Sequence, residues 1–239
     1  MRIARHEEWL RKAAQTWDER AGWWDEMSSA NALSQDRLAE LDRWQTALGI
    51  GPGSRVLDAG CGSGQFAIAW SRRGCLVTGI DVSDEMLARA RVNAAAAEVD
   101  IAFLSSPLAP LALPGASYDA IFCRTVLHLV PAPVAALSEF RRVLRPSGRL
   151  WVSVPGALSP IYANVWRRHM SDSLRPINDM VPWELEMLLE ECGWRVVEQW
   201  GDWSGQDLTD ANGAAAIARE SSSVRLHQAT ATTWGFVAD

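Results

Sequence analysis

The chain has 239 residues, of which 48% are hydrophobic and 22% are charged, and its formal net charge is −6 at pH 7. This composition is ordinary for a folded globular protein and excludes a disordered chain, a collagen-like repeat and a small disulfide-stapled scaffold. The acidic balance disfavours nucleic acid as the main partner, because binding to phosphates needs a basic surface.

The first 50 residues are expected to form two helices. Trp9, Ala13 and Trp17 recur every four residues, and a second apolar series runs from Leu38 to Leu48. Such spacing places apolar side chains on one face of a helix. Three glycines and a proline follow within residues 49–53 and predict the end of this helical region.

From residue 54 onward, strand-like and helix-like patterns alternate. The expected strands are 54–58, 75–80, 101–104, 119–123, 149–154, 194–200 and 232–238, and the expected helices are 64–73, 83–96, 131–144 and 183–192. Ser83 is expected to cap its helix, and a polar segment rich in Ala and Ser precedes the last strand. Near-continuous apolar strands that alternate with helices are typical of a parallel sheet covered on both faces. The prediction is an α/β fold with a doubly wound, mostly parallel, seven-stranded sheet.

Targeting and redox signals are weak in this sequence. No apolar run reaches the roughly 18 residues of a membrane span, and the first residues lack the apolar core of a secretory signal. The four cysteines are scattered, without metal-ligand spacing, so they are interpreted as reduced structural thiols. We therefore expect a cytoplasmic protein with no membrane partner and no metal site, and the sequence leaves its oligomeric state open.

A glycine-rich turn joins the first expected strand to the next helix. Residues 56–64 read Val-Leu-Asp-Ala-Gly-Cys-Gly-Ser-Gly, and the following strand ends at Asp81. Glycines in such a turn permit positive φ angles and a close approach of the backbone to a ligand. An acid at the next strand tip can accept hydrogen bonds from both hydroxyls of a ribose. Together the two features predict a nucleoside-binding site.

These segments resemble the class I S-adenosylmethionine-dependent methyltransferases. Residues 56–64 are similar to their first motif (D-x-G-x-G-x-G), and residues 80–83 (Ile-Asp-Val-Ser) to their second. Residues 118–131 and 144–150 resemble the stretches around the fourth strand and before the fifth. The resemblance covers about residues 50–155, and its closest branch includes quinone and natural-product methyltransferases. It implies a Rossmann-like methyltransferase fold, S-adenosylmethionine as cofactor and in-line transfer of a methyl group to a small-molecule acceptor.

The resemblance also implies the residues of the cofactor site. They are Trp24, Asp58, Gly60, Cys61, Gly62, Gly64, Asp81, Val82, Met86, Leu108 and Arg124. Asp58 would meet the ammonium of the methionine tail, and Arg124 would lie near its carboxylate. Val82, Met86 and Leu108 would contact the adenine, and Trp24 stands where an aromatic ring usually covers the cofactor.

One position departs from the family pattern. The acid that commonly receives the adenine amino group is replaced by Pro107, so we expect backbone groups, Ser105 or Ser106 to serve instead.

The fold is expected to be a single domain, residues 1–239, with four parts. They are an N-terminal helical cap (1–50), the cofactor-binding core (51–155), a lid insertion or substrate segment after the fifth strand (156–182), and a C-terminal helix with the last strands (183–239). The expected substrate-binding residues are Trp17, Trp24, His128, Tyr162 and Trp166. Because methyl transfer needs a base only when the acceptor must lose a proton, the catalytic residue is left unassigned, with His128, His169 and Tyr162 as candidates.

Other functions are less consistent with the motifs. A dehydrogenase would show Gly-x-Gly-x-x-Gly, and Asp58 would lie unfavourably near its pyrophosphate. The Asn/Asp-Pro-Pro-Tyr element of amino-group methylation is replaced by residues 123–126, Cys-Arg-Thr-Val. A non-catalytic member of the same fold, which binds a cofactor or a partner without turnover, stays open as the alternative.

Overall fold

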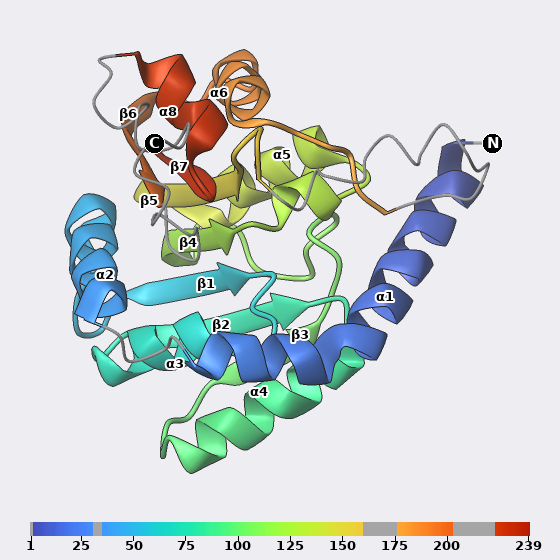
Figure 1. The fold of residues 1–239 in the computed structure, drawn as a ribbon. Coiled ribbons are helices and arrows are strands. Elements are labelled where there is room, and N and C mark those ends of the chain that lie inside the picture. Colours follow the sequence, from blue (N-terminus) through green and yellow to red (C-terminus); the bar gives the residue numbers. More distant parts are fainter. Residues whose placement is uncertain (1, 31–34, 160–175, 203–222) are drawn as a thin grey trace.

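Seven strands form one sheet at the centre of the protein (Figure 1). They are β1 (Arg55–Ala59), β2 (Leu76–Asp81), β3 (Ala102–Ser105), β4 (Tyr118–Arg124), β5 (Leu144–Pro155), β6 (Val196–Asp202) and β7 (Thr233–Ala238). The structure, a computed structural model, describes residues 2–30, 35–159, 176–202 and 223–239. The strand order is β3-β2-β1-β4-β5-β7-β6, and β7 runs antiparallel to both of its neighbours while the other pairs are parallel. The predicted fold class is confirmed, except that the lid insertion falls largely outside the described residues.

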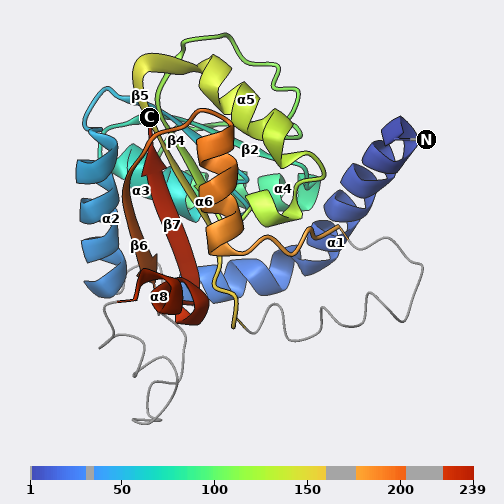
Figure 2. The same cartoon turned by 90° about the horizontal axis from the view of Figure 1, so that it is seen from above.

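Helices cover both faces of the sheet (Figures 1 and 2). Those of the first half are α1 (Arg2–Ala30), α2 (Gln35–Leu48), α3 (Gln65–Arg72) and α4 (Asp84–Ala96). Those of the second half are the 3₁₀ turn η1 (Leu127–Leu129), α5 (Pro133–Val143), α6 (Pro182–Glu191) and α8 (Val224–Thr230). Helices α2, α3 and α4 pack on one face, and α5 and α6 on the other, while the long α1 lies along α4.

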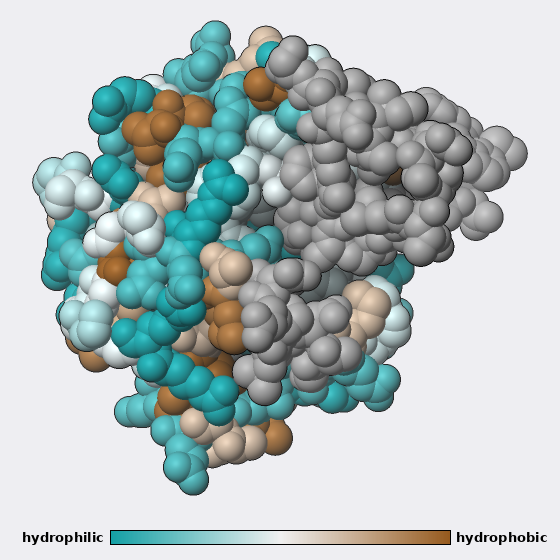
Figure 3. All heavy atoms as spheres, turned by 60° about the vertical axis from the view of Figure 1, so that its left-hand side comes forward, coloured by the Kyte–Doolittle hydropathy of each residue, from teal (hydrophilic) through white to brown (hydrophobic). Residues whose placement is uncertain are grey.

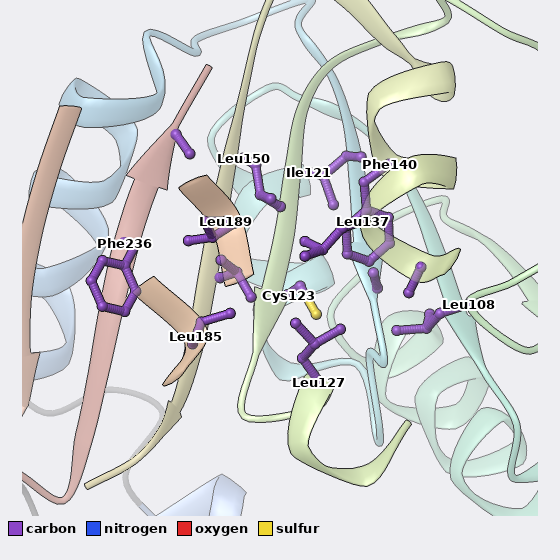
Figure 4. Packing of buried hydrophobic residues seen from close by; sticks show 14 of the residues in the cluster. Leu108, Ile121, Cys123, Leu127, Leu137, Phe140, Leu150, Leu185, Leu189 and Phe236 are labelled. Atoms are coloured by element: carbon purple, nitrogen blue, oxygen red, sulfur yellow. The ribbon is translucent and has the colours of Figure 1, made fainter. Parts of the chain in front are cut away.

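Alternating side chains of the strands build two separate cores. In β4, Ile121 and Cys123 belong to the cluster under α5 and α6, whereas Phe122 belongs to the cluster under α2 and α3. Figure 4 shows the first cluster, where Leu137 of α5 and Leu185 of α6 point towards the strands. Because successive residues of a strand face opposite sides, only a nearly all-apolar sequence can bury both faces. This explains the continuous apolar strands of the sequence.

The strand order reverses between β1 and β4. From β1 the chain moves outward to β2 and β3, and it then returns to place β4 on the other side of β1. In doubly wound sheets a ligand binds at the carboxyl ends of the strands beside such a reversal. The glycine turn after β1 and the segment after β4 both leave the sheet at this point (Figure 1).

Two local results complete the comparison with the predicted elements. Ser83 caps α4, and its Oγ accepts a hydrogen bond from Met86 N at 3.1 Å, as expected from the sequence. Helix α8, in contrast, lies in the polar segment before the last strand, to which the sequence assigns no element. Its seven residues are too few for a helical period to stand out from a polar background.

The surface adds one further observation. On the face drawn in Figure 3, the described residues are mainly hydrophilic, with smaller hydrophobic areas between them. None of the described helices is long and apolar enough to cross a membrane.

Candidate functional site

The glycine turn after β1 holds its shape through positive φ angles. Gly60 and Gly62 have φ values of 79° and 52°, in a region that residues other than glycine rarely adopt. A Cβ on Gly60 would lie 2.4 Å from Cγ2 of Val126, and one on Gly62 would lie 3.1 Å from Nε1 of Trp24. The absence of side chains therefore lets Val126 and Trp24 pack directly against the turn.

Asp81, at the tip of β2, is held by backbone N–H groups. Its Oδ2 accepts from Gly62 N and its Oδ1 from Ser83 N, both at 3.0 Å. Burial raises the pKa of Asp81 and the charge of Asp18 adds to this, while the N–H groups of Ser83, Gly62 and Val82 oppose it. The carboxylate is thus fixed in orientation and also lines a cavity.

Asp58, near the end of β1, is the second carboxylate of the site. Only 3% of the residue is exposed, and its Oδ2 has no hydrogen-bond partner in the part of the chain that the structure describes. Burial raises its pKa to about 7, and the neighbouring charge of Asp81 contributes in the same direction. A buried carboxylate oxygen without a partner is costly, so this position favours a ligand that brings a donor or a positive charge.

Two adjoining cavities open around the turn. The first has a volume of about 100 Å³ and includes Asp81, and the second has a volume of about 180 Å³ and includes Asp58. The residues that line both are Trp24, Gly60, Gly62, Arg124 and Thr125. The two carboxylates therefore face different compartments that meet at the glycine turn.

The first cavity has two chemically different ends. Near β2 it is lined by Asp81, Val82, Met86, Ser106 and Leu108. Towards α1 and the segment after β4 it is lined by Leu10, Ala13, Trp17, Leu129 and Val130. The second set is entirely apolar, so this end suits an apolar ligand.

Polar contacts fix helix α1 over the site. Asp18 Oδ1 accepts a 2.6 Å hydrogen bond from Ser83 Oγ, and Trp9 Nε1 donates to Leu129 O at 2.8 Å. The rings of Trp17 and Trp24 meet edge to face, with their centroids 5.6 Å apart. These contacts bring the aromatic side chains of the N-terminal helix to the cavities.

Most of the predicted site residues line one or both cavities. These are Trp17, Trp24, Asp58, Gly60, Cys61, Gly62, Asp81, Val82, Met86, Leu108 and Arg124. Gly64, with φ of 86°, instead precedes α3, and a Cβ on it would lie 3.1 Å from Ala90 Cβ of α4. It therefore allows α3 and α4 to pack closely.

The candidate bases and the remaining predicted substrate-binding residues divide into two groups. His128 is 1% exposed, lines neither cavity, and burial lowers its pKa to about 3, so its ring is neutral behind the cavity wall. Tyr162, Trp166 and His169 lie outside the described residues.

Comparisons with known proteins complete the description of the site. Residues 57–152 match the model of a family described as "Methyltransferase domain". The ubiquinone biosynthesis O-methyltransferase of Alkalilimnicola ehrlichii is 36% identical over 129 residues, which are 54% of this chain and 52% of that protein. The chain thus spans about half the length of this relative.

Two further proteins match over more of their length. The ubiquinone biosynthesis O-methyltransferase of Xanthomonas campestris pv. campestris is 29% identical over 195 residues, 74% of this chain and 80% of that protein. The crystal structure of a SAM-dependent methyltransferase from Aquifex aeolicus has a TM-score of 0.64 at 20% identity, covering 92% of this chain and 97% of that one. This last likeness shows the shared fold.

Residues 57–152 therefore form a methyltransferase domain, and the relatives support the class I S-adenosylmethionine-dependent type.

Several residues that line the two cavities were not predicted from the sequence. Thr125 lines both cavities and has a φ of 54°, which is rare for a branched side chain. Leu10, Leu129 and Val130 line the apolar end. The apolar spacing of α1 could have included Leu10, which is three residues before Ala13, but no local pattern marks Thr125. Among the described residues, no group of three or more His, Cys, Asp or Glu could hold a metal ion.

Proposed function

We propose that this methyltransferase transfers the methyl group of S-adenosylmethionine to a hydroxyl oxygen of a small, apolar ring compound. The observation that carries the proposal is the pair of carboxylates, Asp58 and Asp81, in two cavities that meet at the glycine turn. The cofactor has an amino acid tail and a nucleoside, and these two cavities offer one acid for each part.

The residues present fit the cofactor at both ends. The unpartnered Oδ2 of Asp58 would accept from the tail ammonium, and Arg124 would lie near the tail carboxylate. Asp81 would receive the ribose hydroxyls, since its oriented carboxylate lines the first cavity. Val82, Met86 and Leu108 would contact the adenine.

The remaining contacts of the cofactor follow from neighbouring residues. Trp24 lines both cavities and would cover the bound molecule beside Gly62. Of Ser105 and Ser106, only Ser106 lines the first cavity. This supports Ser106 as the residue that would bind the adenine amino group, in place of the acid that Pro107 replaces.

The acceptor class follows from the apolar end of the first cavity. Trp17, Leu129 and Val130 offer ring and aliphatic surface without charge. The relatives named above are called O-methyltransferases, which supports oxygen as the atom that is methylated. An aromatic hydroxyl compound satisfies both conditions.

The chain contributes mainly alignment and the exclusion of water. When bound, the cofactor supplies a methyl group on a positively charged sulfur atom. The chain would hold the acceptor oxygen in line with that methyl carbon, so that a carbon–oxygen bond would replace the carbon–sulfur bond and leave S-adenosylhomocysteine and a proton. Holding the two reactants in line can account for roughly 7–11 kcal/mol of the barrier.

The base is proposed to come from the segment after β5, if the acceptor needs one. Tyr162 and His169 are the candidates there, because His128 lines neither cavity and burial lowers its pKa to about 3, which makes it a weak proton acceptor. We also propose that residues 1–50 act as a cap and residues 156–182 as a lid on the acceptor side of the core. We further propose a cytoplasmic location without membrane partners, and the net charge of −6 disfavours a nucleic acid partner.

Two measurements on the purified protein test this function. Titration calorimetry with S-adenosylhomocysteine should show one site per chain. Tritiated S-adenosylmethionine should label a 4-alkylcatechol but not an alkylamine of equal chain length. No binding would refute the methyltransferase site, whereas binding without transfer to any hydroxyl compound would favour the non-catalytic alternative.

A further inference from the structure

The wall of the apolar end is a short 3₁₀ turn with few internal hydrogen bonds. In η1 the amides of Leu129 and Val130 donate to Val126 O and Leu127 O at 2.8 and 3.2 Å. The carbonyls of residues 128–130 receive no bond from within this segment. Such groups need partners from elsewhere when they are buried.

Asn178 supplies most of these partners from a distant part of the chain. Its backbone N donates to His128 O at 2.7 Å, and its Nδ2 donates to Leu127 O and Val130 O at 3.0 Å each. Its Oδ1 accepts from Met180 N at 3.1 Å, so both ends of the amide are used and its orientation is set by these bonds. Neither Asp nor an apolar residue could make the same set.

A second contact joins the same turn to helix α1, which also lines the cavity. Trp9 Nε1 donates to Leu129 O, the carbonyl that Asn178 leaves without a partner. Trp9 is on α1, which contributes Leu10, Ala13 and Trp17 to the same apolar end. The turn is therefore fixed from two sides, by the segment before α6 and by α1.

We infer that Asn178 is the positioning residue of the acceptor site and that Trp9 fixes α1 to the same wall. Asn178 lines neither cavity, so it acts through Leu129 and Val130 and not by contact with a ligand. The cofactor residues Asp58 and Asp81 lie on other elements, and Asp81 is held by other bonds. The expected effect of Asn178 on turnover rests on the proposed function. Its expected effect on the stability of the turn at residues 126–130 does not.

The first test measures amide exchange of residues 126–130 by mass spectrometry. Asn178→Asp keeps the shape but replaces the two side-chain donors by acceptors, and it should speed exchange in this peptide about tenfold or more. Gln15→Glu, an amide-to-carboxylate change at an exposed position of α1, should leave this exchange unchanged. Unchanged exchange in Asn178→Asp would overturn the inference.

The second test separates the acceptor from the cofactor. In Asn178→Asp, kcat/KM for the alkylcatechol should fall about tenfold, while the Kd of S-adenosylhomocysteine should change less than about twofold. Equal losses in both would indicate a general structural defect and contradict a positioning role. Trp9→Phe removes one donor and keeps the ring, so it should give a smaller change in the same direction if Asn178→Asp fails to fold. If the wild-type protein transfers no methyl group, the proposed function fails, and the exchange measurement still decides the role of Asn178.

Discussion

The backbone N–H of Gly62 donates a 3.0 Å hydrogen bond to the carboxylate of Asp81, which lies 19 residues later in the chain. The amides of Gly60 and Cys61 also donate to Ile80 O, at 2.8 and 2.9 Å. The glycine turn and the tip of β2 are therefore one hydrogen-bonded unit. Because the carboxylate is oriented before a ligand arrives, little ordering cost remains at the moment of binding.

Removal of the Asp81 carboxylate should weaken cofactor binding strongly. Asp81→Ala should cost roughly 2–4 kcal/mol of affinity for S-adenosylhomocysteine, about 30- to 1000-fold, because two hydrogen bonds to a charged acceptor are lost. Asp84→Ala, at an exposed acid three residues later, is the matched control and should bind normally. Calorimetry that finds equal affinity in both variants would reject the ribose assignment.

Asp58 should make the ligand-free protein less stable as the pH rises. Its folded pKa is about 7, while an unfolded Asp titrates near 3.9, so the folded chain holds an extra proton between these values. The corresponding stability is present in full below pH 4 and is lost as the pH rises through 7, with a total of about 3–5 kcal/mol. Asp58→Asn should flatten this dependence, and urea unfolding at several pH values measures it. Parallel curves for the two proteins would contradict the prediction.

Asp58→Asn should also lose affinity for the cofactor, although at pH 8 the ligand-free variant should be more stable than the wild type. An amide at position 58 cannot carry the negative charge that the tail ammonium requires, so we expect a loss of about tenfold or more at pH 8. In the wild type, affinity for S-adenosylhomocysteine should rise from pH 6 to pH 8 as Asp58 ionises. Affinity that is independent of pH in this range would place the ammonium elsewhere.

Much of the fold could be predicted because its signals are local. The glycine turn, the acid at the tip of β2 and the Ser83 cap each depend on neighbours in the chain, and the structure places them as expected. The strands that are apolar on both faces can also be predicted as buried strands, since a strand with one face in water would alternate apolar and polar residues.

The acceptor side could not be predicted because its contacts join remote segments. Trp9 and Asn178 meet η1 across 120 and about 50 residues, and no sequence pattern links them. The position of Thr125 is set by the turn after β4, where its N–H donates to Ser153 O of β5 at 3.0 Å. His128 was a candidate base from its residue type and its position after the fourth strand, whereas the lowering of its pKa depends on burial in the folded chain. Tertiary packing, not local propensity, sets all of these positions.

Trp24 should contribute to cofactor binding through contact area. It lines both cavities, and its indole lies against Gly62. Trp24→Ala should therefore lower affinity for S-adenosylhomocysteine about tenfold or more, because a large ring surface is lost from the site. Trp23→Ala removes a neighbouring ring that is 53% exposed and lines neither cavity, so it should bind normally. A ligand-induced fluorescence change that survives in Trp24→Ala but not in Trp23→Ala would refute this role.

Asp18 should determine how firmly α1 is held on the core. Its Oδ1 accepts from Ser83 Oγ at 2.6 Å and from Glu85 N at 3.3 Å, so it helps to satisfy the first turn of α4. Asp18→Ala should cost about 1–2 kcal/mol of stability and should speed tryptic cleavage after Lys12 and Arg20. These sites are on α1, and a helix that detaches more often exposes them more often.

Glu19→Ala provides the control for this experiment, since Glu19 is exposed and its carboxylate accepts only from Gln15 among the described contacts. Both variants remove one negative charge from the same turn of α1, but only one removes the contact with α4. If the two are cleaved at the same rate, the hydrogen bonds of Asp18 do not hold the helix. Slower cleavage of the wild type with S-adenosylhomocysteine should follow as well, because Trp24 on the same helix would then contact the bound ligand.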